Sequence, residues 1–204
     1  MPHPAKILVL RFSAMGDVAM TVPVLQELLA NYPNITLVVV SRKAFEPFFT
    51  GNPNIEFHAF EPKTKHKGII GIYRLFKELK SYKATALADL HKNLRSNVVS
   101  RLFWFTGISM ASLDKGRAEK RALTRKENKE FLPLKSSAQR YADVFARLGF
   151  PFTLKNTLTK QPEILNQAIL KISGKKGAQK WIGVSPFAQH SQKVYPLDKM
   201  DNVL

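Results

Sequence analysis

Residues Lys6 to Leu29 read KILVLRFSAMGDVAMTVPVLQELL, and this stretch decides how the chain folds. Its apolar run, Ile7 to Leu10, is short and rich in branched side chains, which is typical of a strand buried on both faces. Apolar residues then recur at helical spacing, at Val18, Val22, Leu25 and Leu29. The order of strand, tight loop and helix predicts the first half of a parallel α/β sheet.

The loop between this strand and helix lies where parallel sheets bind ligands, at a strand's carboxyl end and a helix N-terminus. Gly16 lets a backbone or a ligand approach closely. Asp17 falls in the first helical turn, where free N–H groups stabilise a carboxylate, so it is either an ordinary helix-start residue or a functional one. The loop carries neither G-x-G-x-x-G nor G-x-x-x-x-G-K-[ST], which excludes the dinucleotide fingerprint and the P-loop.

Further apolar runs extend the predicted sheet along the chain. Strands are expected at residues 35–40, 55–60, 85–90 and 109–113, with helices at 69–82, up to about 105, and at 138–149. Strands that alternate with helices through short connections favour parallel pairing. We therefore expect residues 1–160 to form one Rossmann-like α/β domain.

The composition indicates a globular protein with anionic partners. Apolar residues make up 45% of the 204 residues, and 32 Lys and Arg against 15 Asp and Glu give a formal charge of +17. Such a surplus favours a phosphorylated glycolipid, a nucleic acid or an acidic membrane surface, without choosing among them. No recognised nucleic-acid-binding motif accompanies the charge, so we expect no nucleic acid partner.

Cysteine usage and hydropathy give an expectation about location. The chain has no cysteine, which excludes disulfides and thiolate metal sites and is compatible with a reducing cytoplasm. It shows no apolar core of a signal peptide, and no run approaches the roughly 18 apolar residues of a spanning helix. We expect a cytoplasmic protein whose membrane contact is peripheral.

Two segments are strongly basic. Residues 62–68, PKTKHKG, are interpreted as a solvated surface loop or as a mobile flap over an anionic acceptor. Residues 115–129, KGRAEKRALTRKENK, hold seven Lys or Arg and two Glu. They form either a solvated face or a contact with an anionic membrane or the phosphates of a lipid-linked acceptor.

Residues 11–18, RFSAMGDV, and 21–25, TVPVL, resemble the N-terminus of the ADP-heptose:lipopolysaccharide heptosyltransferases, glycosyltransferase family 9. That family opens with a strand, a basic residue, small residues, Gly-Asp and a helix with a Leu-Pro-like step. The resemblance implies a two-domain GT-B fold and inversion at the transferred sugar. It also implies that Asp17 is the base that activates the acceptor hydroxyl, in a pocket shaped by Arg11, Ser13 and Gly16.

The resemblance extends to two later segments. The pattern from Asp89 to Ser96 matches Asp-x-x-x-x-x-(Lys or Arg)-Ser, which places Arg95 near acceptor or donor phosphates; His91, where a Gln-Gly pair is common, is interpreted as structural. A strand expected at residues 181–185 and the loop ending in Lys193-Val194-Tyr195-Pro196 are similar to the start of the family's second domain. Residues 161–204 would then begin a nucleotide-sugar-binding domain, with Gln189 and Lys193 at the donor.

Together these features predict a transferase that moves heptose or a related sugar from a nucleotide-diphosphate donor, ADP-heptose, in lipopolysaccharide biosynthesis. No metal or cofactor is expected, because no Asp-x-Asp carboxylate pair is present to hold a metal. The chain stops inside an expected helix and matches half to two-thirds of a typical family member. The alternative is therefore a truncated, non-catalytic module that binds anionic glycolipid or nucleic acid.

Overall fold

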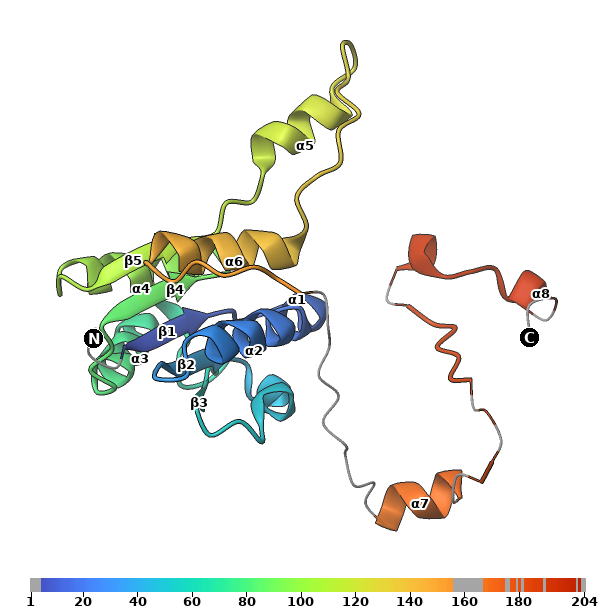
Figure 1. Cartoon of the computed structure of the whole chain (residues 1–204), viewed down its shortest axis with the longest axis horizontal. Coiled ribbons are helices and arrows are strands. Elements are labelled where there is room, and N and C mark those ends of the chain that lie inside the picture. Colours follow the sequence, from blue (N-terminus) through green and yellow to red (C-terminus); the bar gives the residue numbers. More distant parts are fainter. Residues whose placement is uncertain are drawn as a thin grey trace. The chain divides into compact units, whose positions relative to one another are not determined.

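Figure 1 shows the computed structural model of the chain, which describes residues 5–155, 167–174, 177–178, 180, 182–188, 190–200 and 202. The chain divides into two compact units, residues 1–158 and 159–204. Each unit is described by itself. The roles expected for the two parts, acceptor binding and donor binding, stay predictions.

The first unit is built on one parallel sheet of five strands in the order β3-β2-β1-β4-β5. The strands are β1 (Lys6–Leu10), β2 (Thr36–Ser41), β3 (Ile55–Ala59), β4 (Ala86–Asp89) and β5 (Ser109–Ser112). This confirms the α/β class expected from the sequence. The strand order reverses between β1 and β4, which opens a crevice at the carboxyl edge of the sheet, the usual ligand site of such folds.

Helices cover both faces of this sheet, which explains the uninterrupted apolar run of β1 (Figure 1). The helical elements are α1 (Met15–Ala19), α2 (Val22–Asn31), η1 (Lys43–Phe49), α3 (Gly68–Lys80), α4 (Leu94–Trp104), α5 (Arg117–Thr124) and α6 (Ser137–Arg147). Ile7 and Val9 pack in the cluster that includes α2 and α6, whereas Leu8 and Leu10 pack in the one that includes α3 and α4.

The helix expected after the first loop is in fact two helices, and this difference shapes the site. α1 ends at Ala19 and α2 begins at Val22, with Pro23 in the first turn of α2. Proline has no N–H to donate, and its ring conflicts with the carbonyl four residues earlier, here that of Ala19. The break leaves Asp17 on a short separate helix.

The segment at residues 62–68 is a surface loop, as one of its two interpretations expects, but it is anchored at its centre by one buried side chain. The His66 side chain is fully buried, and its ring stacks on Phe60 with centroids 5.7 Å apart. Its Nδ1 accepts the Glu61 backbone N–H at 2.9 Å, and its Nε2 lies 3.1 Å from a carboxylate oxygen of Glu78 on α3. A buried imidazole is stable only with such partners, and Glu78 is supplied from outside the segment.

Residues 114–136, here called the basic arm, leave the sheet after β5, form α5 and return to α6 (Figure 1). Two backbone segments of the arm lie side by side, since the Glu130 N–H donates to the Ala122 carbonyl at 3.1 Å. The arm returns at Ser136, whose hydroxyl accepts the Gln139 N–H at 3.1 Å and caps α6.

The second unit contains α7 (Gln167–Ser173), η2 (Ser191–Lys193) and α8 (Leu197–Met200). The buried strand expected at residues 181–185 is wrong for the described part, because residues 182–185 form no strand and Ile182 is 88% exposed. A strand needs neighbours to pair with, and the described residues of this unit supply none. Across the described residues, no helix has both the length and the apolar character needed to cross a bilayer.

Candidate functional site

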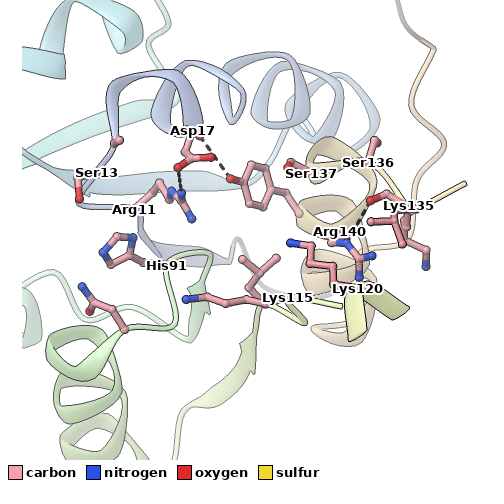
Figure 2. Close-up of a pocket in the computed structure, with 15 residues that line it drawn as sticks. Arg11, Ser13, Asp17, His91, Lys115, Lys120, Lys135, Ser136, Ser137 and Arg140 are labelled. Atoms are coloured by element: carbon pink, nitrogen blue, oxygen red, sulfur yellow. Dashed lines mark hydrogen bonds and ion pairs between the residues drawn. The ribbon is translucent and has the colours of Figure 1, made fainter. Parts of the chain in front are cut away.

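A cavity of about 580 Å³ opens at the carboxyl edge of β1, β4 and β5, beside the point where the strand order reverses (Figure 2). Its walls come from the ends of these strands, from α1 and α6, and from the outgoing and returning segments of the basic arm. The lining residues are Arg11, Ser13, Ala14, Asp17, His91, Asn93, Leu113, Lys115, Lys120, Leu134, Lys135, Ser136, Ser137, Arg140 and Tyr141.

Arg11 is the buried centre of this site. It follows β1 directly and is only 7% exposed. One guanidinium nitrogen donates to the Leu90 carbonyl at 2.6 Å, and another lies 2.5 Å from Oδ2 of Asp17 (Figure 2). The guanidinium also lies over the Tyr141 ring, 5.7 Å from its centroid. A buried cation requires such compensation, so these contacts hold Arg11 in one position.

Asp17 presents its carboxylate at the mouth of the cavity, with 49% of the side chain exposed. It stands in the first turn of α1, as the sequence predicts. The Tyr141 hydroxyl donates to the Asp17 backbone carbonyl at 3.5 Å, which ties α1 to α6. Asp17 is therefore held from both sides of the cavity while its side chain stays open to ligands.

The other expected acceptor residues divide between two places. Ser13 lines the same cavity as Asp17. Gly16 is exposed beside Asp17, and a Cβ built on it would meet nothing within 4 Å, so the fold itself does not require glycine there. Arg95 is exposed on the first turn of α4 and lines a different cavity of about 440 Å³, together with Arg42, Phe60, Glu61, Pro62, Lys63 and Thr64.

The expected donor residues belong to the second unit. Lys193 is the last residue of η2. Gln189 lies outside the described residues. Their contact with a donor stays a prediction.

His91 is a cavity residue that the sequence alone presents only as structural. Its ring lies 5.3 Å from that of Phe12, and its Nδ1 is buried with no hydrogen-bond partner among the described residues. Burial, followed by the nearby cations Arg11 and Lys115, lowers its pKa to about 4. At neutral pH His91 is therefore an uncharged imidazole in a basic cavity. The sequence alone could not show this, because it depends on the strand register: Leu10 pairs with Asp89, which brings the residues that follow β1 and β4 together.

Asp89 explains why the chain turns sharply after β4. Its side chain is fully buried, and Oδ1 accepts the backbone N–H groups of His91 at 2.9 Å and Lys92 at 2.8 Å. The next residue, Asn93, caps α4 by accepting the Ser96 N–H at 2.9 Å. These bonds position the His91 ring at the cavity wall.

Four further cations face the cavity from the basic arm and α6: Lys115, Lys120, Lys135 and Arg140. Partial burial, and then the neighbouring Arg117 and Arg11, lower the pKa of Lys115. A concave site lined by one sign of charge concentrates ligands of the opposite sign. The cavity is thus suited to an anionic ligand.

Among the described residues, one cluster has the donor types of a metal site: His58, His66 and Glu78, whose ligand atoms lie within 4.8 Å of one another. The proton positions argue against a metal there. Nδ1 of His66 accepts a backbone N–H, which places the ring proton on Nε2, the atom that faces Glu78. Lys65 also occupies this carboxylate at 3.0 Å. The cluster is better explained as a hydrogen-bond network that anchors residues 61–67.

The chain resembles a known glycosyltransferase in sequence. No protein-family model matches the sequence. Over 97 residues the chain is 29% identical to the lipopolysaccharide core heptosyltransferase OpsX of Haemophilus influenzae, covering 48% of this chain and 27% of that protein.

Solved structures show the same fold. A glycosyl transferase family 9 protein of Veillonella parvula matches with a TM-score of 0.71 and 19% identity, over 100% of this chain and 60% of that one. Escherichia coli heptosyltransferase WaaC with ADP-2-deoxy-2-fluoro heptose matches with a TM-score of 0.53 and 18% identity, over 75% and 50%. The chain thus spans 60% or less of the length of each of these relatives. In sequence and in fold, it is similar to part of the family 9 glycosyltransferases and lipopolysaccharide heptosyltransferases, as its first loop predicts.

Proposed function

We propose that this chain supplies the acceptor-binding side of an inverting glycosyltransferase that moves heptose, or a related sugar, from ADP-heptose to an anionic lipopolysaccharide core acceptor. The single observation that carries the proposal is the Asp17 carboxylate, half exposed at the mouth of a basic cavity and paired with the buried Arg11. The names of the relatives, a core heptosyltransferase and an enzyme solved with an ADP-heptose analogue, support the choice of substrates.

In the proposed reaction Asp17 acts as general base. Its Oδ2 pairs with Arg11, which leaves the other carboxylate oxygen for the acceptor hydroxyl. That hydroxyl oxygen attacks the anomeric carbon of the donor while its proton passes to Asp17. The bond from the anomeric carbon to the diphosphate breaks on the opposite face, so the configuration inverts and the nucleoside diphosphate leaves.

The cations around the cavity would hold the acceptor. Lys115, Lys120 and Lys135 line it from the basic arm, where each offers mobile N–H donors to an anionic group. His91, uncharged at neutral pH, would contribute a hydrogen bond rather than a charge. Arg95 lines the neighbouring cavity, so we assign it to a more distant part of the acceptor.

On the donor side, the proposal assigns Gln189 and Lys193 to the diphosphate, where a lysine ammonium would offset the charge of the leaving group. This assignment rests on the resemblance alone. The proposed enzyme needs no metal, because lysine supplies the positive charge. We further propose that it works in the cytoplasm, at the inner face of the inner membrane, where a lipid-borne core acceptor is available.

Substitution of Asp17 by asparagine tests the proposal. The amide keeps the size of the side chain but cannot accept a proton, so transfer from ADP-heptose to core acceptor should fall about 100- to 10,000-fold. Product would be measured by mass spectrometry, and acceptor binding should change little. The Tm should fall only modestly, because the asparagine loses the negative charge but keeps an oxygen that can accept a hydrogen bond from Arg11. The matched control is Glu127→Gln, which removes an exposed carboxylate outside the cavity.

Wild-type turnover by Asp17→Asn would remove Asp17 from the mechanism. If the unmodified protein bound acceptor at the cavity without any transfer, the alternative of a non-catalytic anion-binding module would be favoured instead. Binding of RNA in place of core oligosaccharide would contradict the choice of acceptor.

A further inference from the structure

The basic arm exposes two adjacent large apolar side chains. Phe131 is 79% exposed and Leu132 is 69% exposed, on the segment that returns from α5 to α6. Leu134, two residues later, is partly buried and lines the cavity. Adjacent exposed apolar side chains on a charged segment are typical of a surface that meets an apolar phase.

The same arm also carries exposed cations. Two of the arm's glutamates are already engaged, Glu119 by Arg140 at 2.6 Å and Glu130 by Arg125 at 2.7 Å, which leaves Glu127 as the remaining one. Five exposed cations take part in no ion pair among the described residues: Arg117, Lys120, Arg121, Lys126 and Lys129. The arm therefore carries a surplus of positive charge beside its apolar pair.

The arm is held at its base by one buried side chain. Arg140 on α6 donates to Glu119 at the start of the arm and, through Nε, to the Lys135 carbonyl at its end at 3.1 Å. Gly116 has φ of +59° and lies against the same guanidinium, with which an added Cβ would collide. These contacts fix the base of the arm. The arm itself projects from the sheet (Figure 1).

We propose that the basic arm is a docking element for an anionic lipid bilayer, with Phe131 and Leu132 inserted at the headgroup boundary and the cations against the lipid headgroups. An aromatic and an aliphatic side chain flanked by Lys and Arg is the composition of interfacial membrane contacts. A nucleic acid would use the cations but gains little from an exposed leucine. Only the biological purpose of this docking rests on the proposed function. Lys120 and Lys135 of the same arm line the cavity, so a docked arm would place the cavity near a lipid-borne acceptor.

Flotation with lipid vesicles tests the proposal on the full chain. The unmodified protein should float with vesicles of phosphatidylcholine and phosphatidylglycerol, and should not float with phosphatidylcholine alone. The variant F131S/L132S should lose about tenfold or more in apparent affinity, and R117Q/R121Q/K126Q/K129Q should lose at least as much because each headgroup contact is lost. High salt should likewise weaken the binding of the unmodified protein to these vesicles.

The chain offers a matched control at the end of α4. Trp104 and Phe105 are also adjacent and exposed, at 66% and 78%, but lie outside the arm. The variant W104S/F105S should therefore float as the unmodified protein does. Since all four side chains are exposed, circular dichroism and thermal unfolding should confirm that both double variants fold normally.

Three results would overturn the proposal: equal flotation of F131S/L132S and the unmodified protein, an equal loss in W104S/F105S, or equal binding to phosphatidylcholine alone. Preferential binding of the arm to RNA would do the same. The result is separable from the proposed catalysis, because Asp17→Asn should reduce transfer sharply and leave flotation unchanged. Flotation without any transfer would contradict the enzyme and not the docking element.

Discussion

Arg11 and His91 lie just beyond the ends of neighbouring strands, and they differ in charge. The guanidinium of Arg11 is a permanent cation, and the Leu90 carbonyl and the Asp17 carboxylate that face it compensate for its burial. Burial, together with that fixed positive charge, makes protonation of His91 unfavourable. The site thus combines one permanent cation with one neutral hydrogen-bonding ring.

His91 should make the stability of the fold depend on pH. A histidine whose folded pKa lies below its unfolded value stabilises the fold above the unfolded pKa, and that contribution is lost as the pH falls from about 6.5 toward about 4. Between pH 7 and pH 5 the loss from this residue is about 1 kcal/mol once solvent screening of the partly exposed ring is allowed for. Urea unfolding at both pH values should show this loss, and His91→Gln should remove most of it. An equal pH dependence in His91→Gln would contradict the buried neutral state.

Two glycine substitutions should separate ligand contact from folding. Gly16→Ala meets no neighbouring atom and lies in α1, so the free energy of unfolding should change by less than about 1 kcal/mol. If the acceptor passes close to this backbone, KM for acceptor should rise. Gly116→Ala should instead lower the free energy of unfolding by about 1–2 kcal/mol, because alanine is strained in the left-handed backbone conformation of this position. The collision of its Cβ with Arg140 should add to that loss. Denaturant unfolding and acceptor titration check both, and an unchanged KM in Gly16→Ala would show that no ligand approaches there.

At the scale of elements, Pro23 and His66 each give a local structure that differs from the one that the sequence pattern predicts. Pro23 divides one apolar helical pattern into α1 and α2, so that Asp17 lies on a five-residue helix beside the loop. His66 turns a lysine-rich segment into a turn fixed on α3. In both cases the chemistry of a single residue decided the local structure, against the pattern of the surrounding stretch.

The network around Glu78 should respond to loss of one charge. Burial raises the pKa of Glu78, but the hydrogen bonds from Lys65 and His66 lower it by more. The pKa of Glu78 therefore lies below its usual value of 4.5. A carboxylate with a depressed pKa stabilises the fold above the unfolded pKa and loses that contribution as the pH falls. Glu78→Gln should therefore lower the free energy of unfolding by about 1 kcal/mol at pH 7, and less at acid pH, below the ordinary glutamate pKa. Thermal unfolding measures this, with Glu127→Gln as control, and added Zn²⁺ should not shift the Tm of the unmodified protein.

At the scale of the whole molecule, the formal charge of +17 contributes to two different surfaces. Part of it lines the cavity and part lies on the outer surface of the basic arm. The first group suits an anionic acceptor, and the second suits an anionic surface that presents one. The cations of the cavity and those of the outer surface meet in the basic arm, whose base forms part of the cavity wall.

Metal removal should leave the proposed reaction intact. The proposal gives the leaving diphosphate a lysine as its counter-charge, so EDTA should not change the rate of sugar transfer by more than about twofold. Transfer would be followed by ADP release, with and without added Mg²⁺. Loss of transfer in EDTA that Mg²⁺ restores would contradict the assignment of this role to Lys193.

The residue pattern by itself determined the parallel α/β class and the positions of the five strands, because buried strands and amphipathic helices differ in period and length. It also placed Asp17 in a helix's first turn. Tertiary structure alone decided that Arg11, Asp17 and His91 share a cavity while Arg95 lines another, since that depends on strand register and on where α4 begins. Only the fold, too, brought Arg140 to the base of the basic arm, because contacts between segments far apart in sequence leave no local periodicity to read.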